Sequence, residues 1–209
     1  NLEKVLYPHA GFTKGEVLDY YSRVGEVMAA HLRGRPITMK RYPNGVAQGA
    51  FFEKNCPSHH PDWIPTCAVQ YKADSDPIKF CLLEDRPSIM GAANLASLEI
   101  HPSLAPAERP FEPTMIAFDL DPGPPAGLKE CLWVAFRLKA VLDHLGLRSV
   151  VKTSGGKGLH VYVPLNRPHT YEETTPFAMA LAGLLTRQHP DRVVYSKRRD
   201  LRVGKVLVD

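Results

Sequence analysis

The chain of 209 residues is long enough to bury a core, and its 44% apolar and 23% charged residues exclude a disordered or low-complexity protein. Its 26 Lys and Arg against 22 Asp and Glu give a net charge of +4, which favours a polyanionic partner. No apolar run is long enough to span a membrane and the start carries no secretion signal, so we expect a soluble cytoplasmic protein.

In the first half of the chain, apolar residues at helical spacing predict a helix over 12–34, with Thr13 and Glu16 at the spacing of a capping box. Residues 37–42 and 46–54 predict a hairpin, because Asn44-Gly45 is typical of a tight turn. The remaining elements expected here are a strand pair at 66–71 and 78–83, a helix over 88–98 and a strand that ends at 101.

The four cysteines of the chain are Cys56, Cys67, Cys81 and Cys131. They lack paired spacing and the density of a small secreted scaffold, so we expect free thiols in a reducing compartment. Cys56, His59, His60 and Cys67 could alternatively form a zinc site, although the spacing of structural zinc modules is absent. A surface loop with chance His and Cys residues is the simpler interpretation.

The second half of the chain begins after a Pro-rich segment, 102–113, which predicts a linker. The elements expected after it are a strand over 114–119 followed by an acidic turn, a helix over 127–146, a strand pair at 149–153 and 159–164, a helix over 172–187 and a closing strand over 202–209. The apolar face predicted for the first of these helices consists of Leu128, Leu132, Ala135, Leu142 and Leu145. Mixed strands and helices predict an α+β fold with antiparallel pairs.

Residues 114–123 read TMIAFDLDPG, an apolar stretch that ends in Asp119 and Asp121. Side chains two positions apart in a strand share a face, so the two carboxylates would repel each other unless a cation lies between them. With Asp209 at the end of another strand, the three acids match the needs of two-metal phosphoryl transfer. The alternative is a solvated acidic turn, which Asp-Pro-Gly also favours.

Residues 154–160 read SGGKGLH and lie between two predicted strands. Glycines let backbone N–H groups approach phosphate oxygens, and Ser154, Lys157 and His160 could add donors and positive charge. The segment matches neither the P-loop nor the dinucleotide fingerprint, so a flexible hairpin turn is the alternative.

Eight segments in order along the chain resemble the polymerase (primase-like) domain of bacterial and archaeal DNA ligase D, a branch of the archaeo-eukaryotic primase superfamily that acts in non-homologous end joining. These segments are NLEKVLYP, TKGEVLDYY, HLRGRPITMKRYPNG, FFEKNCPSHHPDW, LEIH, FDLDPG, TSGGKGLHVYVP and RVGKVLVD. The resemblance implies one primase-polymerase domain with a primase-polymerase-like α+β core of antiparallel and mixed sheets flanked by helices. Within it we expect an N-terminal lobe over 1–101, the linker and a catalytic core over 114–209, as a fragment of a longer chain.

The resemblance implies roles for individual residues. It assigns Mn²⁺ or Mg²⁺, as two divalent ions, to Asp119, Asp121 and Asp209. It assigns the incoming nucleoside triphosphate to Ser154, Gly155, Gly156, Lys157, His160, His101 and Arg202. It assigns the 5′-phosphate of the downstream DNA strand to Lys4 and Lys14, and the template strand to Lys40, Phe51 and Phe52.

The function implied by the resemblance is template-dependent nucleotidyl transfer by a DNA-directed DNA/RNA polymerase that fills gaps and extends ends. The implied partners are DNA with gaps or 3′ overhangs and a 5′-phosphate, NTP or dNTP, Ku and DNA ligase, in a nucleoid-associated setting without a membrane. Two alternatives remain: a haloacid-dehalogenase-like phosphatase, which also begins with D-x-D after an apolar strand, and a non-catalytic DNA-end-binding module.

Overall fold

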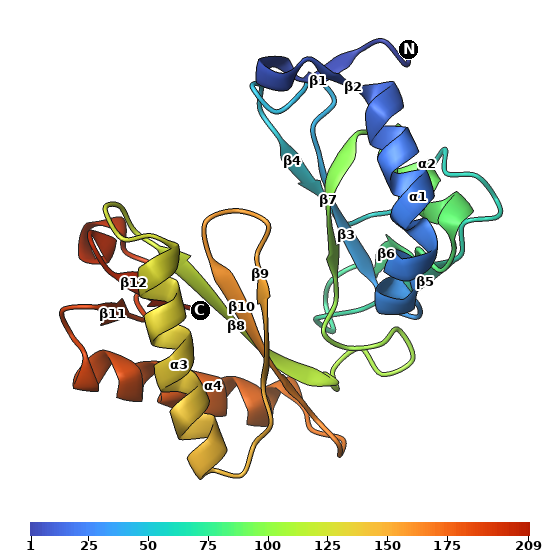
Figure 1. Cartoon of the computed structure of the whole chain (residues 1–209). Helices are drawn as coiled ribbons and strands as arrows, with labels where there is room; N and C mark the ends of the chain where they lie inside the picture. The colour runs from blue at the N-terminus through green and yellow to red at the C-terminus, as the bar shows by residue number, and fades with distance from the viewer. The chain divides into compact units, whose positions relative to one another are not determined.

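The computed structural model describes all residues from 1 to 209, which form two compact units (Figure 1). Unit 1 comprises Asn1–Pro110 and unit 2 comprises Phe111–Asp209. The boundary falls inside the Pro-rich segment 102–113. Both units combine helices with largely antiparallel sheets, which confirms the predicted α+β class.

Unit 1 begins with a short hairpin that leads into a long helix. Its first elements are β1 (Val5–Tyr7), the 3-10 helix η1 (Pro8–Ala10), β2 (Phe12–Thr13) and α1 (Lys14–Leu32). The Thr13 hydroxyl accepts a hydrogen bond from the backbone N–H of Glu16, and the Glu16 carboxylate accepts one from the backbone N–H of Thr13 at 2.7 Å. This reciprocal pair is the predicted capping box, and it fixes the start of α1.

The main sheet of unit 1 has five strands, in the order β4-β3-β6-β5 with β7 also paired to β3. Its elements are β3 (Ile37–Arg41), β4 (Phe51–Glu53), β5 (Thr66–Val69), β6 (Ile78–Cys81), α2 (Arg86–Asn94) and β7 (Ser97–Pro102). Helices α1 and α2 contribute to one core with the inward side chains of β3, Ile37 and Met39. The outward side chains of β3, β4 and β7 are therefore left on the open face of this sheet.

The connection between β3 and β4 differs from the tight hairpin predicted at Asn44-Gly45. Gly45 has a φ of 85° and its N–H donates to the carbonyl of Tyr42 at 2.9 Å, so a turn does form there. The N–H of Val46 then donates to the carbonyl of Leu6 at 2.8 Å instead of to the facing strand. This bond to the N-terminal hairpin diverts the chain, and β4 begins only five residues later, at position 51.

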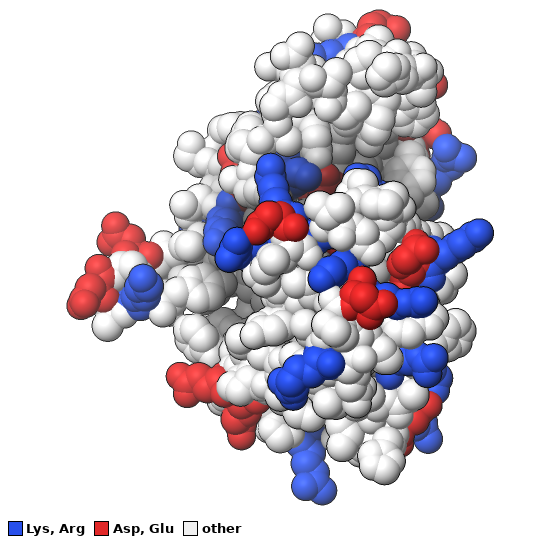
Figure 2. All heavy atoms as spheres, turned by 90° about the vertical axis from the view of Figure 1, so that its left-hand side faces the viewer, with Lys and Arg blue, Asp and Glu red and all other residues white.

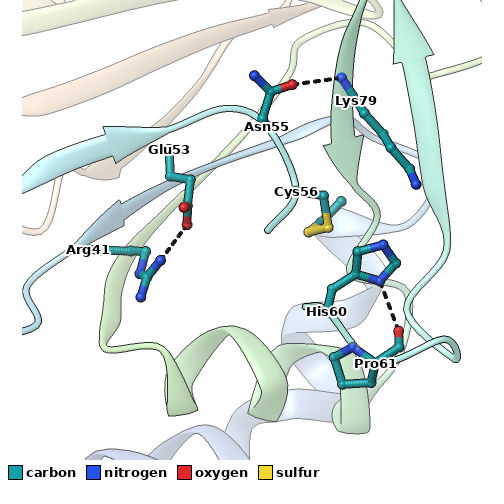
Figure 3. Close-up of a disulfide and its surroundings, with 8 residues drawn as sticks. Arg41, Glu53, Asn55, Cys56, His60, Pro61 and Lys79 are labelled. Carbon is teal, nitrogen blue, oxygen red and sulfur yellow. Dashed lines mark hydrogen bonds and ion pairs between the residues drawn. A yellow bond between two sulfur atoms is a disulfide. The ribbon is translucent and has the colours of Figure 1, made fainter. Parts of the chain in front are cut away.

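Two of the four cysteines form a disulfide, so the prediction of four free thiols is wrong for this pair. Cys56 is bonded to Cys81 at the end of β6, with their Cα atoms 4.9 Å apart (Figure 3). Cys67 and Cys131 are free. The bonded sulfurs are buried in the core of unit 1, and the disulfide removes Cys56 from the alternative zinc site. The neighbouring His60 ring lies 3.0 Å from the carbonyl of Pro61 instead (Figure 3).

Unit 2 contains a five-stranded sheet in the order β11-β12-β8-β10-β9, in which only the β11–β12 pair is parallel. Its elements are β8 (Met115–Pro122), α3 (Leu128–His144), β9 (Val150–Thr153), β10 (Leu159–Pro164), α4 (Tyr171–Gln188), β11 (Val193–Val194), the 3-10 helix η2 (Arg199–Arg202) and β12 (Val206–Val208). Strand β8 lies at the centre and extends through the acidic segment, so the predicted acidic turn after residue 119 is wrong.

Helices α3 and α4 pack into one core with β8, β10, β11 and β12. The apolar face predicted for α3 is largely incorrect, because Leu128, Leu132 and Leu145 are 48%, 42% and 48% exposed. The side chains of α3 that are fully buried are those of Cys131, Val134, Leu138 and Leu142. These four also recur at helical spacing, so periodicity alone could not select between the two overlapping stripes.

Charge is dispersed on the face drawn in Figure 2, where Lys and Arg side chains lie among Asp and Glu. No helix of the structure is both long enough and apolar enough to cross a membrane. On the face drawn in Figure 2, the basic side chains therefore do not form a uniformly basic surface.

Candidate active site

Three acidic residues share the face of the unit 2 sheet that is opposite the helices. Alternation along β8 buries Phe118 and Leu120 in the helix-covered core, so Asp119 and Asp121 project from the other face. The residue opposite Asp119 on the next strand is Asp209: the two exchange both backbone hydrogen bonds, at 2.9 and 3.0 Å. Directly opposite residues of paired strands point to the same face, so the three carboxylates form one group.

On the other side of β8, His160 of β10 is also opposite Asp119. A row of Asp209, Asp119 and His160 therefore crosses three adjacent strands. The His160 Nε2 atom lies 3.5 Å from a carboxylate oxygen of Asp119, and its Nδ1 atom lies 3.1 Å from the hydroxyl of Tyr162. The structure thus brings the predicted phosphate-binding histidine to the predicted metal-binding acids.

The surroundings of Asp119 oppose ionisation of its carboxyl group. Burial raises the pKa of its carboxyl above the usual value, and the like charges of Asp121 and Asp209 add to the rise. His160 and Arg202 oppose this rise in pKa. The net increase in the pKa of Asp119 is therefore due first to burial, with the like charges as a smaller contribution.

Each of the three carboxylates faces a basic side chain. Besides His160 at Asp119, the guanidinium of Arg202 donates to Asp121, and the Lys197 ammonium lies 2.8 Å from Asp209. Lys197 and Arg202 both come from the basic segment 196–205. In this arrangement no group of three or more His, Cys, Asp or Glu side chains surrounds a common metal position.

The predicted glycine-rich segment forms the loop between β9 and β10. The hydroxyl of Ser154 accepts hydrogen bonds from the backbone N–H groups of Gly156 and Gly158, at 3.3 and 3.2 Å. A Cβ atom on Gly158 would lie 2.0 Å from the carbonyl oxygen of Leu120, so the loop packs directly against β8 beside Asp121. Lys157 is exposed at the tip of this loop.

Gly123, two residues after Asp121, allows a close backbone contact with the segment that carries Arg202. A Cβ atom on Gly123 would lie 2.0 Å from the carbonyl oxygen of Arg202. The N–H of Gly123 donates to the carbonyl of Lys205 at 2.8 Å, and the N–H of Gly204 donates to the carbonyl of Gly123 at 3.1 Å. Only glycine permits this approach, which brings the backbone of η2 against β8 and the Arg202 side chain onto Asp121.

The other predicted site residues belong to unit 1. Lys40 of β3 is opposite Phe52 of β4, and His101 of β7 is on the same open face. The ring centroids of Phe52 and His101 are 5.6 Å apart, and the Lys40 ammonium lies 5.5 Å from the Phe52 ring. Phe51, on the opposite face of β4, has the Arg41 guanidinium 5.4 Å from its ring. Both phenylalanines are exposed, so neither is a core residue.

Lys4 and Lys14 are neighbours in unit 1, because the backbone N–H of Lys14 donates to the carbonyl of Lys4 at 2.8 Å. The Lys4 ammonium lies 3.4 Å from the side-chain oxygen of Asn44. Neither lysine has a carboxylate partner within ion-pair distance. The two lysines therefore occupy neighbouring backbone positions without an acidic partner, which suits a phosphate site.

Four residues that contact the predicted site residues were not predicted from the sequence. Lys197 contacts Asp209, Tyr162 contacts His160, and Glu99 and Tyr42 both contact Lys40. Tyr162 and Glu99 lie two positions from His160 and His101 in their strands, so strand alternation could have indicated them. The contact of Lys197 with Asp209 carries no such local signal, since it depends on how the 195–205 segment folds back.

The chemistry of the three acids fits divalent ions of the Mg²⁺ or Mn²⁺ type, which prefer carboxylate oxygens. Three negative side chains on one face and the raised pKa of Asp119 are the features that such an ion would relieve. Bound ions would take the place that the cationic side chains now hold at these carboxylates.

Comparison with known protein families gives a match over residues 13–209 to the LigD primase-polymerase domain. The chain belongs to the LigD primase-polymerase domain family. As a primase-polymerase domain it is a nucleotidyltransferase domain. The family match includes residues 114–123, so the phosphatase alternative for that segment is excluded.

Curated relatives of this LigD primase-polymerase domain extend well beyond it. It is 39% identical to the multifunctional non-homologous end joining protein LigD of Mycolicibacterium smegmatis, over 100% of this chain and 27% of that protein. It is 35% identical to the corresponding LigD protein of Pseudomonas aeruginosa, over 99% of this chain and 24% of that one. The chain therefore spans about a quarter of the length of these relatives.

A solved structure supports the same assignment. The polymerase domain from Mycobacterium tuberculosis ligase D, in complex with DNA, is similar with a TM-score of 0.90 and 35% sequence identity. The similarity covers 100% of this chain and 75% of that one. The fold expected from the resemblance is thereby confirmed.

Proposed function

We propose that this domain is a template-dependent polymerase that fills gaps and extends 3′ overhangs of broken DNA, with Asp119, Asp121 and Asp209 holding two divalent ions. The observation that supports this proposal is the group of three carboxylates on β8 and at the end of the adjacent strand β12. Two divalent ions, Mn²⁺ or Mg²⁺, would activate the primer hydroxyl and neutralise the triphosphate. Without such ions the three acids repel one another and would repel a phosphate.

The residues around the acids are suited to bind the triphosphate of an NTP or dNTP. We assign this role to Ser154, Gly155, Gly156, Lys157, His160 and Arg202. Ion binding at Asp121 would release the Arg202 guanidinium, which could then donate to a phosphate oxygen. The N–H groups of Gly156 and Gly158 donate to the Ser154 hydroxyl. Rotation of this hydroxyl would leave both N–H groups available to donate to a phosphate.

Unit 1 would bind DNA and help to bind the nucleotide. We assign the 5′-phosphate of the downstream strand to Lys4 and Lys14, which have no carboxylate partner. Lys40, Phe51 and Phe52 would hold the template strand, since exposed aromatic rings can stack on unpaired bases. His101 would contact the incoming nucleotide. Ku and a DNA ligase are the partners that the end-joining role implies.

A primer-extension assay tests the function. A labelled primer on a gapped template should be extended in the presence of Mn²⁺ and nucleotides, and Asp119→Ala should abolish extension while DNA affinity stays within about twofold, because the acids contribute no attraction to phosphate. Extension by Asp119→Ala above a tenth of the parent rate would reject the assignment. DNA binding by the parent without extension would instead support a non-catalytic DNA-end-binding module.

A further inference from the structure

Glu99 of β7 is an acidic residue on the open face of the unit 1 sheet. It is opposite Lys40 in the β3–β7 pair, and Lys40 is in turn opposite Phe52 in the β3–β4 pair. The side chains of Glu99 and His101 are 42% and 47% exposed, while that of Lys40 is 27% exposed. The three strands thus bring a carboxylate among the residues that the proposed function assigns to DNA and nucleotide.

The Glu99 carboxylate accepts from several neighbours at once. Its Oε1 atom accepts from the Lys40 ammonium at 2.7 Å and from the Tyr42 hydroxyl, and its Oε2 atom lies 3.3 Å from Nε2 of His101. These contacts reach side chains from β3, β7 and the residue that follows β3. A single side chain therefore fixes the orientation of three others.

The orientation of Lys40 extends to the aromatic rings. Its ammonium lies 5.4 Å from the Tyr42 ring centroid and 5.5 Å from that of Phe52, within the range of cation–π attraction. Phe52 in turn meets the His101 ring edge to face, at an interplanar angle of 63°. Removal of the carboxylate would release the cation that these rings share.

The charges in this cluster are stable at neutral pH. Burial opposes ionisation of Glu99, but hydrogen bonds from Lys40 and Tyr42 outweigh it and lower the pKa of the carboxyl. The hydrogen bond to Glu99 likewise raises the pKa of the Lys40 ammonium. Glu99 and Lys40 therefore form an ion pair in which both groups are charged at neutral pH.

We propose that Glu99 is a positioning residue for DNA binding: its carboxylate holds Lys40, Tyr42 and His101 in the orientation that an unpaired DNA strand requires. This inference rests on the proposed function, which assigns DNA to the same face. By charge alone, a carboxylate here repels phosphate and weakens binding. If Glu99 acts only through its charge, its removal should tighten DNA binding. If it positions the neighbouring side chains, its removal should weaken DNA binding, so the sign of the change in affinity separates the two roles.

The test measures the affinity of Glu99→Ala for a duplex with a fluorescent 3′ overhang. We expect the dissociation constant to rise about tenfold, comparable to the loss of one charge-assisted hydrogen bond, although the substitution makes the protein more positive. We also expect a plot of log Kd against log salt concentration to become less steep, because Lys40 loses its orientation. The change in slope should correspond to about one phosphate contact. A loss of stability without a positioning role would leave this slope unchanged.

Two further variants serve as controls. Glu26→Ala removes the same charge from unit 1 at a side chain that is 76% exposed, and it should bind DNA as the parent does. Glu99→Gln keeps an oxygen that can accept from Lys40 and Tyr42, so it should recover at least half of the lost affinity on a logarithmic scale. Glutamine has the same size as glutamate, so Glu99→Gln should fold as the parent does. A melting temperature equal to that of the parent confirms this.

Unchanged or tighter binding by Glu99→Ala would overturn the inference; if the alanine variant does not fold, the same outcome is tested with Glu99→Leu, which is of similar size and cannot accept from Lys40 or Tyr42. Primer extension by the parent is measured separately. Failure of the parent to extend primers would count against the proposed polymerase function, while the binding series would still decide the role of Glu99.

Discussion

Asp119 of β8 and Asp209, the residue after β12, are directly opposite each other and exchange both backbone hydrogen bonds, at 2.9 and 3.0 Å. The pairing fixes their side chains on one face of the sheet. Because these bonds involve only backbone atoms, the two carboxylates stay together whatever their protonation state. The site thus forces like charges together in the absence of a divalent ion.

The first prediction concerns pH. A carboxyl whose pKa is raised on folding binds protons more tightly in the folded state, so it destabilises the fold above its folded-state pKa and ceases to do so as the pH falls. In metal-free buffer, Asp119→Asn should therefore be more stable than the parent at pH 7.5, and this advantage should shrink towards pH 4. Urea unfolding of both proteins at several pH values measures it. An advantage that grows towards low pH would contradict the raised pKa.

The second prediction concerns metal binding. Mn²⁺ should raise the melting temperature of the parent, because a ligand that binds only the folded state stabilises it by mass action. Asp121→Asn should lose most of this response and should melt no lower than the metal-free parent, since the substitution removes a repulsion together with a ligand. Differential scanning fluorimetry with and without Mn²⁺ measures both effects.

Asp191→Asn is the matched control, because Asp191 is a 78% exposed acid of unit 2 away from the three carboxylates. It should keep the full Mn²⁺ response. If Asp121→Asn also keeps it, the segment 114–123 does not hold a metal.

The third prediction concerns the glycine-rich loop. Gly158→Ala should destabilise the protein by about 1–3 kcal/mol, because its Cβ atom would lie 2.0 Å from the backbone oxygen of Leu120. Gly156→Ala should be nearly neutral, since the nearest atom to its Cβ would be the Ser154 hydroxyl at 3.9 Å. Urea unfolding compares the two. Equal stabilities would show that the loop does not pack against β8 at Gly158.

The fourth prediction concerns the disulfide. Its two cysteines are 25 residues apart, so its reduction should lower the free energy of unfolding by about 2–4 kcal/mol. The Cys56→Ser, Cys81→Ser double variant should show the same loss and no longer respond to a reducing agent. Cys67→Ser, which changes a free thiol, should respond as the parent does. Thiol alkylation of the denatured protein without reductant should modify two cysteines, and modification of all four would contradict the bond.

The fifth prediction concerns the 5′-phosphate. A gapped DNA with a 5′-phosphate should bind more tightly than the same DNA with a 5′-hydroxyl, because two lysines can donate to the phosphate. Replacement of Lys4 and Lys14 by alanine should abolish the difference, whereas Lys139→Ala on α3 should preserve it. Competition binding with the two DNAs measures the ratio. Equal affinities of the parent for both would reject the site.

The sequence determined the elements whose signals are local. The capping box of Thr13 and Glu16 is formed by residues three positions apart, and the shared face of Asp119 and Asp121 follows from strand alternation. The order of the longer helices and strands followed from the same periodicities, whereas the short strands β1, β2 and β11 were not predicted. Eight segments in a fixed order were also sufficient to indicate the family, because the order of motifs is a property of the chain itself.

Only the tertiary structure decided which distant residues meet. The pairing of Asp209 with Asp119, the bond of Cys56 to Cys81 and the ion pair of Arg202 with Asp121 all join segments that are far apart in the chain. Strand order and loop packing set these contacts, and neither has a local periodicity. The buried face of α3 was predicted incorrectly for a related reason. Its side chains are apolar on more than one side, and only contact with β8 and α4 determines which of them are buried.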